Sequence, residues 1–337
     1  MTRVRRVLTL GLALTLAVTL AGCSRGEDRL VVYSGRTADL IGPLLERFNK
    51  ESGVKIDVKY GDSSELALLL GEEGERTPAD VFLSQSPGAT GFLATRNLLA
   101  PLTGEELGKV PGTFRNAEGR WVGTTGRQRV LVYNTKLIKE ADLPKSVFDV
   151  TGPAYKGEVA VAPSNGSFQD FVSAMRQLAG EDRTKAWLEA MARNNSPTYA
   201  NNNAIVEAVG RGEVPMGLVN HYYNFRFKDE NPALPTANHI FPDGDLGSMV
   251  IPSTVSVLSS SDRKEDAARL VDFLLTTRSQ EYFRDETFEY PLAGGVQPLA
   301  EVPPLEQATL PRIDIDKLGS ELQGTVQMIR ASGLEGS

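Results

Sequence analysis

The sequence predicts an α/β protein of two lobes with a hinged cleft between them. Three observations support this class. Strands and helices alternate at the start of the ordered region, and the roughly 315 residues after position 22 exceed what one hydrophobic core usually holds. A long apolar strand also returns late in the chain, which suggests that the chain crosses between the lobes more than once. Lobes joined in this way can close on a ligand.

The first third of the chain has a strand–helix–strand–helix–strand order. Apolar residues recur at helical spacing in two segments and alternate with polar residues in another. We expect, in order, strand 30–33, helix 40–48, strand 54–60, helix 66–70 and strand 81–83. This order predicts a parallel sheet with helices on its faces, in which ligands bind near the carboxyl ends of strands. The loops after Tyr33 and Leu83 are therefore the first places to look for a site.

The remaining elements complete two lobes. We expect two strand pieces within 121–132 broken at Thr125-Gly126, strand 158–162, a helix from Ser167, helix 204–209, strand 214–219, strand 250–258 and one long helix 265–282. The return strand leads us to divide the chain between lobes. One lobe, the N-lobe, takes 30–126 and 252–305, and the other, the C-lobe, takes 127–251 and 306–337.

The beginning of the chain has the features of a secretory signal. Three arginines precede an apolar run over 7–21, and small residues then lead to Cys23. The ending Leu20-Ala21-Gly22-Cys23 resembles the bacterial lipobox, in which the cysteine becomes the lipidated N-terminus. We therefore expect a lipoprotein signal peptide at 1–22, a tether at 23–29 and an extracytoplasmic protein that is lipid-anchored to the cell membrane through Cys23.

Charge and composition narrow the function. Without residues 1–22 the chain has 33 basic and 43 acidic residues, which disfavours nucleic acid as a partner. The chain has two histidines and one cysteine, and it has no G-x-S-x-G, P-loop or H-E-x-x-H motif. A secreted enzyme is therefore disfavoured, and we expect a monomeric binding protein.

Two adjacent tyrosines, Tyr222 and Tyr223, follow a predicted strand. In a strand their side chains would point to opposite faces, whereas in a first helical turn both hydroxyls could converge. A bound cation of high charge can displace a phenol proton, and phenolate is a hard oxygen donor suited to Fe³⁺. The alternative is that one tyrosine belongs to the core and the other to the surface.

Several segments in order resemble the bacterial ferric-iron-binding proteins of ABC importers. They are Val32-Tyr33-Ser34-Gly35-Arg36, Glu73-Gly74, Pro78-Ala79-Asp80-Val81-Phe82, residues 126–134, Gly166-Ser167-Phe168-Gln169-Asp170, Asn220-His221-Tyr222-Tyr223 and Glu289-Tyr290-Pro291-Leu292. The resemblance implies a transferrin-like, type II-like periplasmic-binding-protein fold. It also implies Fe³⁺ held by Tyr222 and Tyr223, a synergistic anion such as carbonate or phosphate, and delivery to an ABC permease. Asn202 and Asn220 match family positions whose amides bind the anion.

Other residues are candidates for the anion site. Asn165, Gly166 and Ser167 open a helix, whose free N–H groups and dipole favour an anion, although Asn165 and Ser167 could serve only as helix caps. The guanidinium groups of Arg36, Arg127 and Arg129 could each donate two hydrogen bonds to an anion, and among the last two we favour Arg127. One or both of these two could instead be surface charges.

The sequence departs from the family pattern at two positions where other members have metal ligands. Where some members have histidine and glutamate ligands, this chain has Thr37 and Gln85, and no tyrosine lies near Ser167. We expect two strong protein ligands, with Gln85, Arg129 and His221 as outer partners. A binding protein for an oxyanion or organic phosphonate without iron is the nearest alternative. A sensor domain that presents its ligand to a membrane receptor also fits the sequence.

Overall fold

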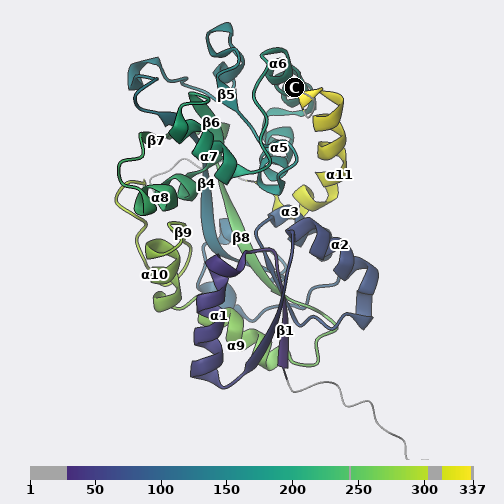
Figure 1. Cartoon of the computed structure of the whole chain (residues 1–337). Coiled ribbons are helices and arrows are strands. Elements are labelled where there is room, and N and C mark those ends of the chain that lie inside the picture. The colour runs from purple at the N-terminus through teal and green to yellow at the C-terminus, as the bar shows by residue number, and fades with distance from the viewer. Residues whose placement is uncertain (1–28, 243, 303–312, 335–337) are drawn as a thin grey trace, which may run out of the picture.

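Nine strands form one continuous sheet in the computed structural model, which describes residues 29–242, 244–302 and 313–334 (Figure 1). The predictions for Cys23 and the signal peptide lie outside these residues. The strands are β1 Arg29–Ser34, β2 Lys55–Tyr60, β3 Val81–Ser84, β4 Val122–Asn134, β5 Val159–Ala160, β6 Met216–Asn220, β7 Thr236–His239, β8 Val250–Val257 and β9 Tyr290–Pro291. The α-helices are α1 Ala38–Ser52, α2 Ser63–Glu73, α3 Pro87–Ala94, α4 Gly104–Gly108, α5 Gly166–Ala179, α6 Glu181–Arg193, α7 Asn202–Arg211, α8 His221–Glu230, α9 Lys264–Leu274, α10 Thr277–Asp285 and α11 Ile315–Ala331.

The long strand β4 links the two lobes. The strand order is β2-β1-β3-β8-β4-β6-β5, with β7 and β9 also paired to β4. The first half of β4 pairs antiparallel with β8 as far as Gln128, and its second half pairs with β6 from Arg129 onward. In Figure 1, β4 and β8 run between the lower group of α1, α2 and α9 and the upper group of α5–α8. The predicted two-lobed α/β class is confirmed, and the lobe boundaries stay a prediction.

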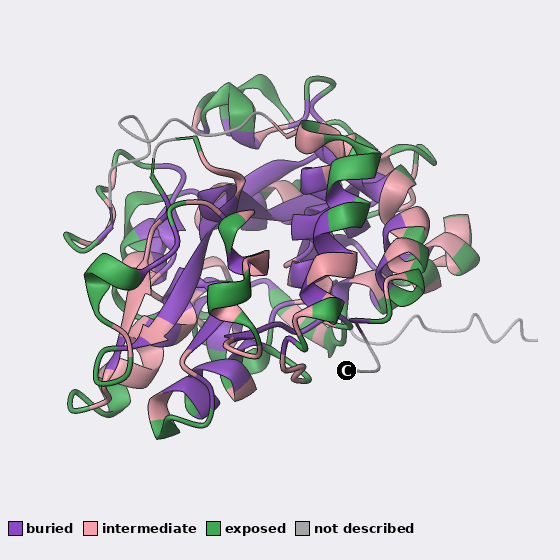
Figure 2. Ribbon diagram, turned by 90° about the horizontal axis from the view of Figure 1, so that it is seen from above, coloured by how far each residue is buried: buried purple, intermediate pink, exposed green. Residues whose placement is uncertain are grey.

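Each lobe packs apolar side chains on both faces of its part of the sheet. In the C-lobe, Val130 and Val132 pack toward the side of α7, whereas Leu131 packs toward α5 and α6, because successive strand residues point to opposite faces. The N-lobe likewise has one core under α1 and α9 and another under α2 and α3. Figure 2 shows the buried strands enclosed by helices whose outer faces are exposed. This two-sided burial explains the apolar runs in β1, β3 and β6.

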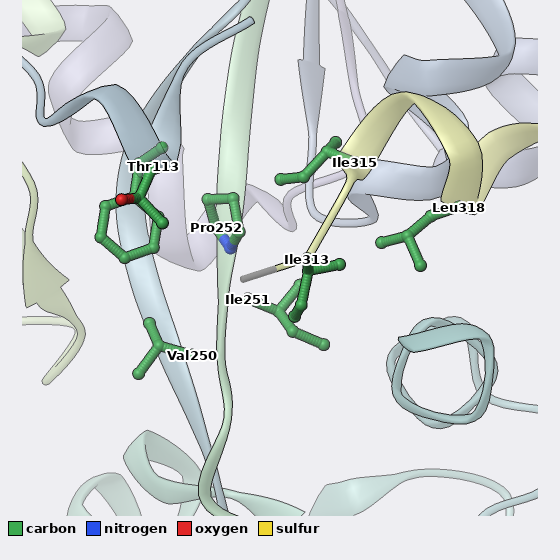
Figure 3. A pocket seen from close by; sticks show the side chains of 8 residues that line it. Thr113, Val250, Ile251, Pro252, Ile313, Ile315 and Leu318 are labelled. Atoms are coloured by element: carbon green, nitrogen blue, oxygen red, sulfur yellow. The ribbon is translucent and has the colours of Figure 1, made fainter. Parts of the chain in front are cut away.

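The C-terminal helix α11 packs against both α3 and α5. Gly319 permits this close approach, because a Cβ there would lie 2.2 Å from the backbone nitrogen of Phe92. At its start, α11 borders an apolar pocket of about 10 Å³ beside β8 (Figure 3). The pocket is lined by Thr113, Phe114, Val250, Ile251, Pro252, Ile313, Ile315 and Leu318. None of the predicted site residues is among them, so this pocket belongs to the hinge packing.

Three predicted elements differ from the structure. The strand over 121–132 is not broken at Thr125-Gly126, because a register shift against β8 between Gly123 and Thr125 absorbs the irregularity. The predicted helix 265–282 is two helices, since Thr276 caps a new one by accepting a hydrogen bond from the Ser279 N–H. The predicted strand 158–162 is reduced to the two residues of β5.

Candidate functional site

A cavity of about 50 Å³ lies between the lobes, at the ends of strands and the starts of helices. It is lined by Gly35, Asp62, Ser63, Gln85, Ser86, Arg127, Asn165, Gly166, Ser167 and Tyr223. The loops after β1 and β3 contribute to this lining, as the parallel sheet predicts. Gln85 and Ser86 come from the N-lobe, whereas Asn165–Ser167 and Tyr223 come from the C-lobe, so the site is built by both lobes.

Tyr222 and Tyr223 lie in the first turn of α8, directly after β6. Their rings stack with centroids 4.2 Å apart. Tyr222 is fully buried, and its hydroxyl accepts a 2.8 Å hydrogen bond from Gln85 Nε2 in the other lobe. Burial, and then the adjacent Tyr223, raise the pKa of Tyr222 well above its ordinary value. The helical turn therefore brings both tyrosines to the cleft. Tyr222 is a neutral phenol at neutral pH as long as no cation is bound to it.

The start of α5 forms a polar cradle beside the tyrosines. Asn165 caps the helix, because its Oδ1 accepts hydrogen bonds from the N–H and the hydroxyl of Ser167. Asn202 at the start of α7 donates to Asn165 Oδ1 at 3.2 Å and to Ser167 Oγ at 3.1 Å. The structure thus brings these three residues together with Gly166 at one helix N-terminus, where free N–H groups favour an anion.

Arg127 and Arg129 are both buried on β4, so the surface alternative is wrong for each of them. Arg127 lines the cavity and donates to the Gln85 carbonyl and, at 3.4 Å, to the Pro252 carbonyl. Its Nε has no hydrogen-bond partner among the described residues.

Arg129 is not among the residues that line the cavity, and its hydrogen bonds are made within the C-lobe. It donates to Asn220 Oδ1 at 3.2 Å and to the Leu218 carbonyl at 2.9 Å. Burial and the adjacent Arg127 lower its pKa to about 9. The Nδ2 of Asn220 is buried and has no partner in the part of the chain that the structure describes. Arg129 therefore holds Asn220 beside the first turn of α8.

Arg36 is placed differently from the other anion candidates. Its guanidinium is buried in a two-point ion pair with Glu289 and donates to Ser253 Oγ at 2.8 Å. It is not among the residues that line the cavity. Its two terminal nitrogens are engaged and only its Nε lacks a partner among the described residues. Because Arg36 also does not line the cavity, we leave it out of the proposed anion site. The ion pair was not predicted, since 253 residues separate its two members.

His221 is a buried packing residue next to the tyrosines. Its Nδ1 accepts the N–H of Gln128 at 3.0 Å, and its ring packs near Tyr290 and Phe225. Burial lowers its pKa to about 4, so the imidazole is neutral. Its contacts fit a role in holding α8 against β4.

The sequence reasoning missed four polar residues of the cleft, which are Asp62, Ser63, Ser86 and Asp170. Asp62 and Ser63, at the start of α2, line the cavity, and Ser63 Oγ accepts the N–H of Gln85 at 3.0 Å. Asp170 of α5 accepts a 2.8 Å hydrogen bond from Ser86 Oγ, so it joins the two lobes. A signal existed for Asp62, because Gly61-Asp62-Ser63-Ser64 lies at the end of a strand that is parallel to β1. Asp170 ends the family-like segment 166–170, but nothing in that segment indicates its contact with Ser86.

The described residues contain neither a cluster of the usual metal-binding side chains nor a helix that could span a membrane. No group of three or more histidine, cysteine, aspartate or glutamate side chains there could hold a metal ion. No helix among the same residues combines the length and the apolar character that are needed to cross a bilayer.

Residues 76–321 match the family model described as bacterial extracellular solute-binding protein. The chain belongs to this family. The sequence of this solute-binding protein is 32% identical to that of the Fe(3+)-binding periplasmic protein of Serratia marcescens. The match covers 98% of this chain and 99% of the relative. It is also 30% identical to the major ferric iron-binding protein of Neisseria meningitidis serogroup B, and this match covers 95% of this chain and 97% of that relative. The crystal structure of iron-bound HitA from Pseudomonas aeruginosa has a TM-score of 0.86 and 33% identity, and the match covers 91% of this chain and 99% of that one. The chain's own family is one of solute-binding proteins and not of enzymes.

Proposed function

We propose that this solute-binding protein captures Fe³⁺ together with a small anion in the cleft between its lobes. The observation that carries the proposal is the pair of stacked phenols of Tyr222 and Tyr223 at the cavity, beside the N-terminus of α5. The names of the relatives support the same metal. A trivalent cation prefers hard oxygen donors, and two phenolates supply them.

The anion has its own set of donors in the proposed complex. Arg127 has a buried Nε without a partner in the described chain, and Asn165, Gly166 and Ser167 at the start of α5 line the same cavity. Asn202 and Asn220 lie next to this helix start and next to the tyrosines, respectively. An anion held there would occupy coordination positions of the iron that the two tyrosines leave open. Carbonate and phosphate both have the size and charge for this role.

Iron binding and cleft closure are linked in this proposal. Tyr222 must lose a proton whose pKa is raised by burial, so iron and protons compete for the phenol, and acid favours release. Contacts that cross the cleft then hold the lobes together. Gln85 donates to Tyr222, and Arg226 of α8 pairs with Asp39 of α1 at 2.8 Å. Docking on a permease would favour the open form and release the ion.

A titration tests the metal assignment. Iron-stripped protein is titrated with ferric citrate in carbonate buffer, and we expect a visible phenolate-to-iron charge-transfer band that saturates at one iron per chain. The double variant Tyr222→Phe, Tyr223→Phe should lose the band. The matched control Tyr60→Phe, Tyr155→Phe removes two phenols outside the cavity lining and should keep it. A wild-type protein without the band, or a double variant that retains it, would refute the assignment.

A binding protein for an oxyanion or phosphonate remains the competing proposal, because Arg127 and the start of α5 need no metal to hold an anion. Under that alternative, inorganic phosphate or 2-aminoethylphosphonate raises the melting temperature of the iron-free protein. The rise requires Arg127 and is insensitive to Fe³⁺. Under the iron proposal, the stabilisation by phosphate grows when Fe³⁺ is added.

We also propose that the protein is a monomer, anchored through a lipid on Cys23, and that it delivers its ion to an ABC permease. The basic and apolar residues before Cys23 support the anchor. The variant Cys23→Ala should move the protein from the membrane fraction to the soluble fraction of its host. Retention of this variant in the membrane fraction would contradict the lipid anchor.

A further inference from the structure

We infer that Asp62 is a third protein ligand of the captured ion, contributed by the lobe opposite the tyrosines. This inference rests on the proposed iron function and adds to it. Thr37 and Gln85 leave the N-lobe without a strong ligand at the positions where some relatives have one. Asp62 is the one carboxylate among the residues that line the cavity, which also include Tyr223.

The local geometry orients the Asp62 side chain. Asp62 caps α2, and its Oδ1 accepts the N–H of Ser64 at 2.8 Å and of Glu65 at 3.3 Å. These bonds use one oxygen and fix the plane of the carboxylate. The other oxygen, Oδ2, lies 3.9 Å from the place where a Cβ on Gly166 would be, so it faces the start of α5 across the cleft.

The positive end of α5 attracts the Asp62 carboxylate as long as no anion is bound there. The positive end of α5 is the expected anion site, and a fixed carboxylate directed at it from the other lobe would repel any anion bound there. A trivalent cation between them reverses the effect, because both negative groups are then attracted to it. The arrangement is therefore favourable when a cation is bound and unfavourable when an anion is bound alone.

Charge balance favours the same role. Fe³⁺ with two phenolates retains one positive charge, and a carboxylate is a hard oxygen donor that neutralises it. The synergistic anion is then balanced by Arg127 and the helix N-terminus. A ligand from α2 in the N-lobe, with tyrosines from α8 in the C-lobe, also makes the ion a direct bridge between the lobes.

The variant Asp62→Asn separates a ligand from a cap. Asparagine caps helices about as well as aspartate, but it carries no charge and is a poor ligand for Fe³⁺. The matched control is Asp314→Asn, which removes the same charge from the cap of α11, where Asp314 accepts the N–H of Lys317. Iron affinity is measured by competition with citrate, and the charge-transfer band is recorded for each protein. A second variant, Asp62→Ser, repeats the test with another good cap.

We expect Asp62→Asn and Asp62→Ser to bind iron at least about tenfold more weakly, since loss of even an outer partner of a metal ligand costs about that much. Their charge-transfer band should also shift in wavelength, whereas Asp314→Asn should match the wild type in both measurements. Unchanged affinity and an unchanged band in the Asp62 variants would overturn the inference and leave the iron function standing. Tighter iron binding would also overturn it, because the carboxylate would then act only by repelling the anion. A wild-type protein without the band would instead refute the proposed function itself.

Discussion

Replacement of Asp170 by asparagine should make the protein more stable at alkaline pH but not at acid pH. Asp170 is 1% exposed on α5 and accepts hydrogen bonds from the Ser86 hydroxyl and the Gly88 N–H at the start of α3. It therefore joins the two lobes next to the cavity. Asparagine has nearly the same shape, and its carbonyl oxygen can accept both hydrogen bonds, so the contact is retained while the charge is removed.

The size and sign of the effect follow from the pKa of this carboxyl. Burial raises the pKa of Asp170 from the ordinary 3.8 to about 7, and the nearby Arg127 and the Ser86 hydrogen bond oppose this only in part. Between these values the folded protein binds more protons than the unfolded chain, so the free energy of unfolding falls as pH rises through this window. At roughly 1.36 kcal/mol per pKa unit, the cost of ionised Asp170 is on the order of 4 kcal/mol above pH 7.

The assay is urea unfolding of the iron-free protein at pH 4.5 and pH 8.5. The difference in unfolding free energy, Asp170→Asn minus wild type, should increase toward alkaline pH by up to about 4 kcal/mol. The control Asp57→Asn, at an exposed position on β2, should give the same difference at both pH values. A difference for Asp170→Asn that does not change with pH would refute the argument, because it would mean that burial does not hold this carboxyl protonated.

Three further substitutions test the packing around the site. Glu289→Gln leaves the buried guanidinium of Arg36 without its charged partner and should lower the urea-unfolding free energy by about 3–5 kcal/mol; a loss below about 1 kcal/mol would contradict this. Gly319→Ala directs a Cβ at the backbone of α3 and should cost about 1–3 kcal/mol, measured as a lower melting temperature. Asn201→Ala removes the cap that accepts the Ala204 N–H at 3.0 Å and should cost about 1 kcal/mol in urea unfolding, whereas Asn201→Asp should cost little.

Local patterns were sufficient to predict most of the fold. The alternation of strands and helices before β4 and the return strand β8 follow from apolar spacing, because each element buries a face set by its own periodicity. The division between α9 and α10 was missed, since Leu274 to Thr277 contains no glycine or proline and the break depends on the Thr276 cap. Apolar periodicity continues across such a cap, so spacing alone does not reveal it.

The site was predictable only where the chain itself brings residues together. Tyr222 and Tyr223 are neighbours in sequence, and Asn165 and Ser167 share one helix start, so their proximity needed no tertiary information. The ion pair between Arg36 and Glu289 was not predicted, because Glu289 lies far along the chain. Asp170 meets Ser86 only after the lobes are assembled. Contacts between distant segments depend on topology, and a single sequence does not encode them in local patterns.

The hinge strand β4 explains why metal, anion and closure act together in the proposed mechanism. Arg127 and Arg129 are two residues apart on β4, so both point to one face, and both are buried where the strand passes between lobes. Burial and, after it, repulsion by the adjacent Arg127 lower the pKa of Arg129. An anion at the cavity would offset this repulsion, and the metal would then be attracted by both the anion and the phenolates. Since the positive charge belongs to the strand that joins the two lobes, we expect binding of the anion and closure of the cleft to favour each other.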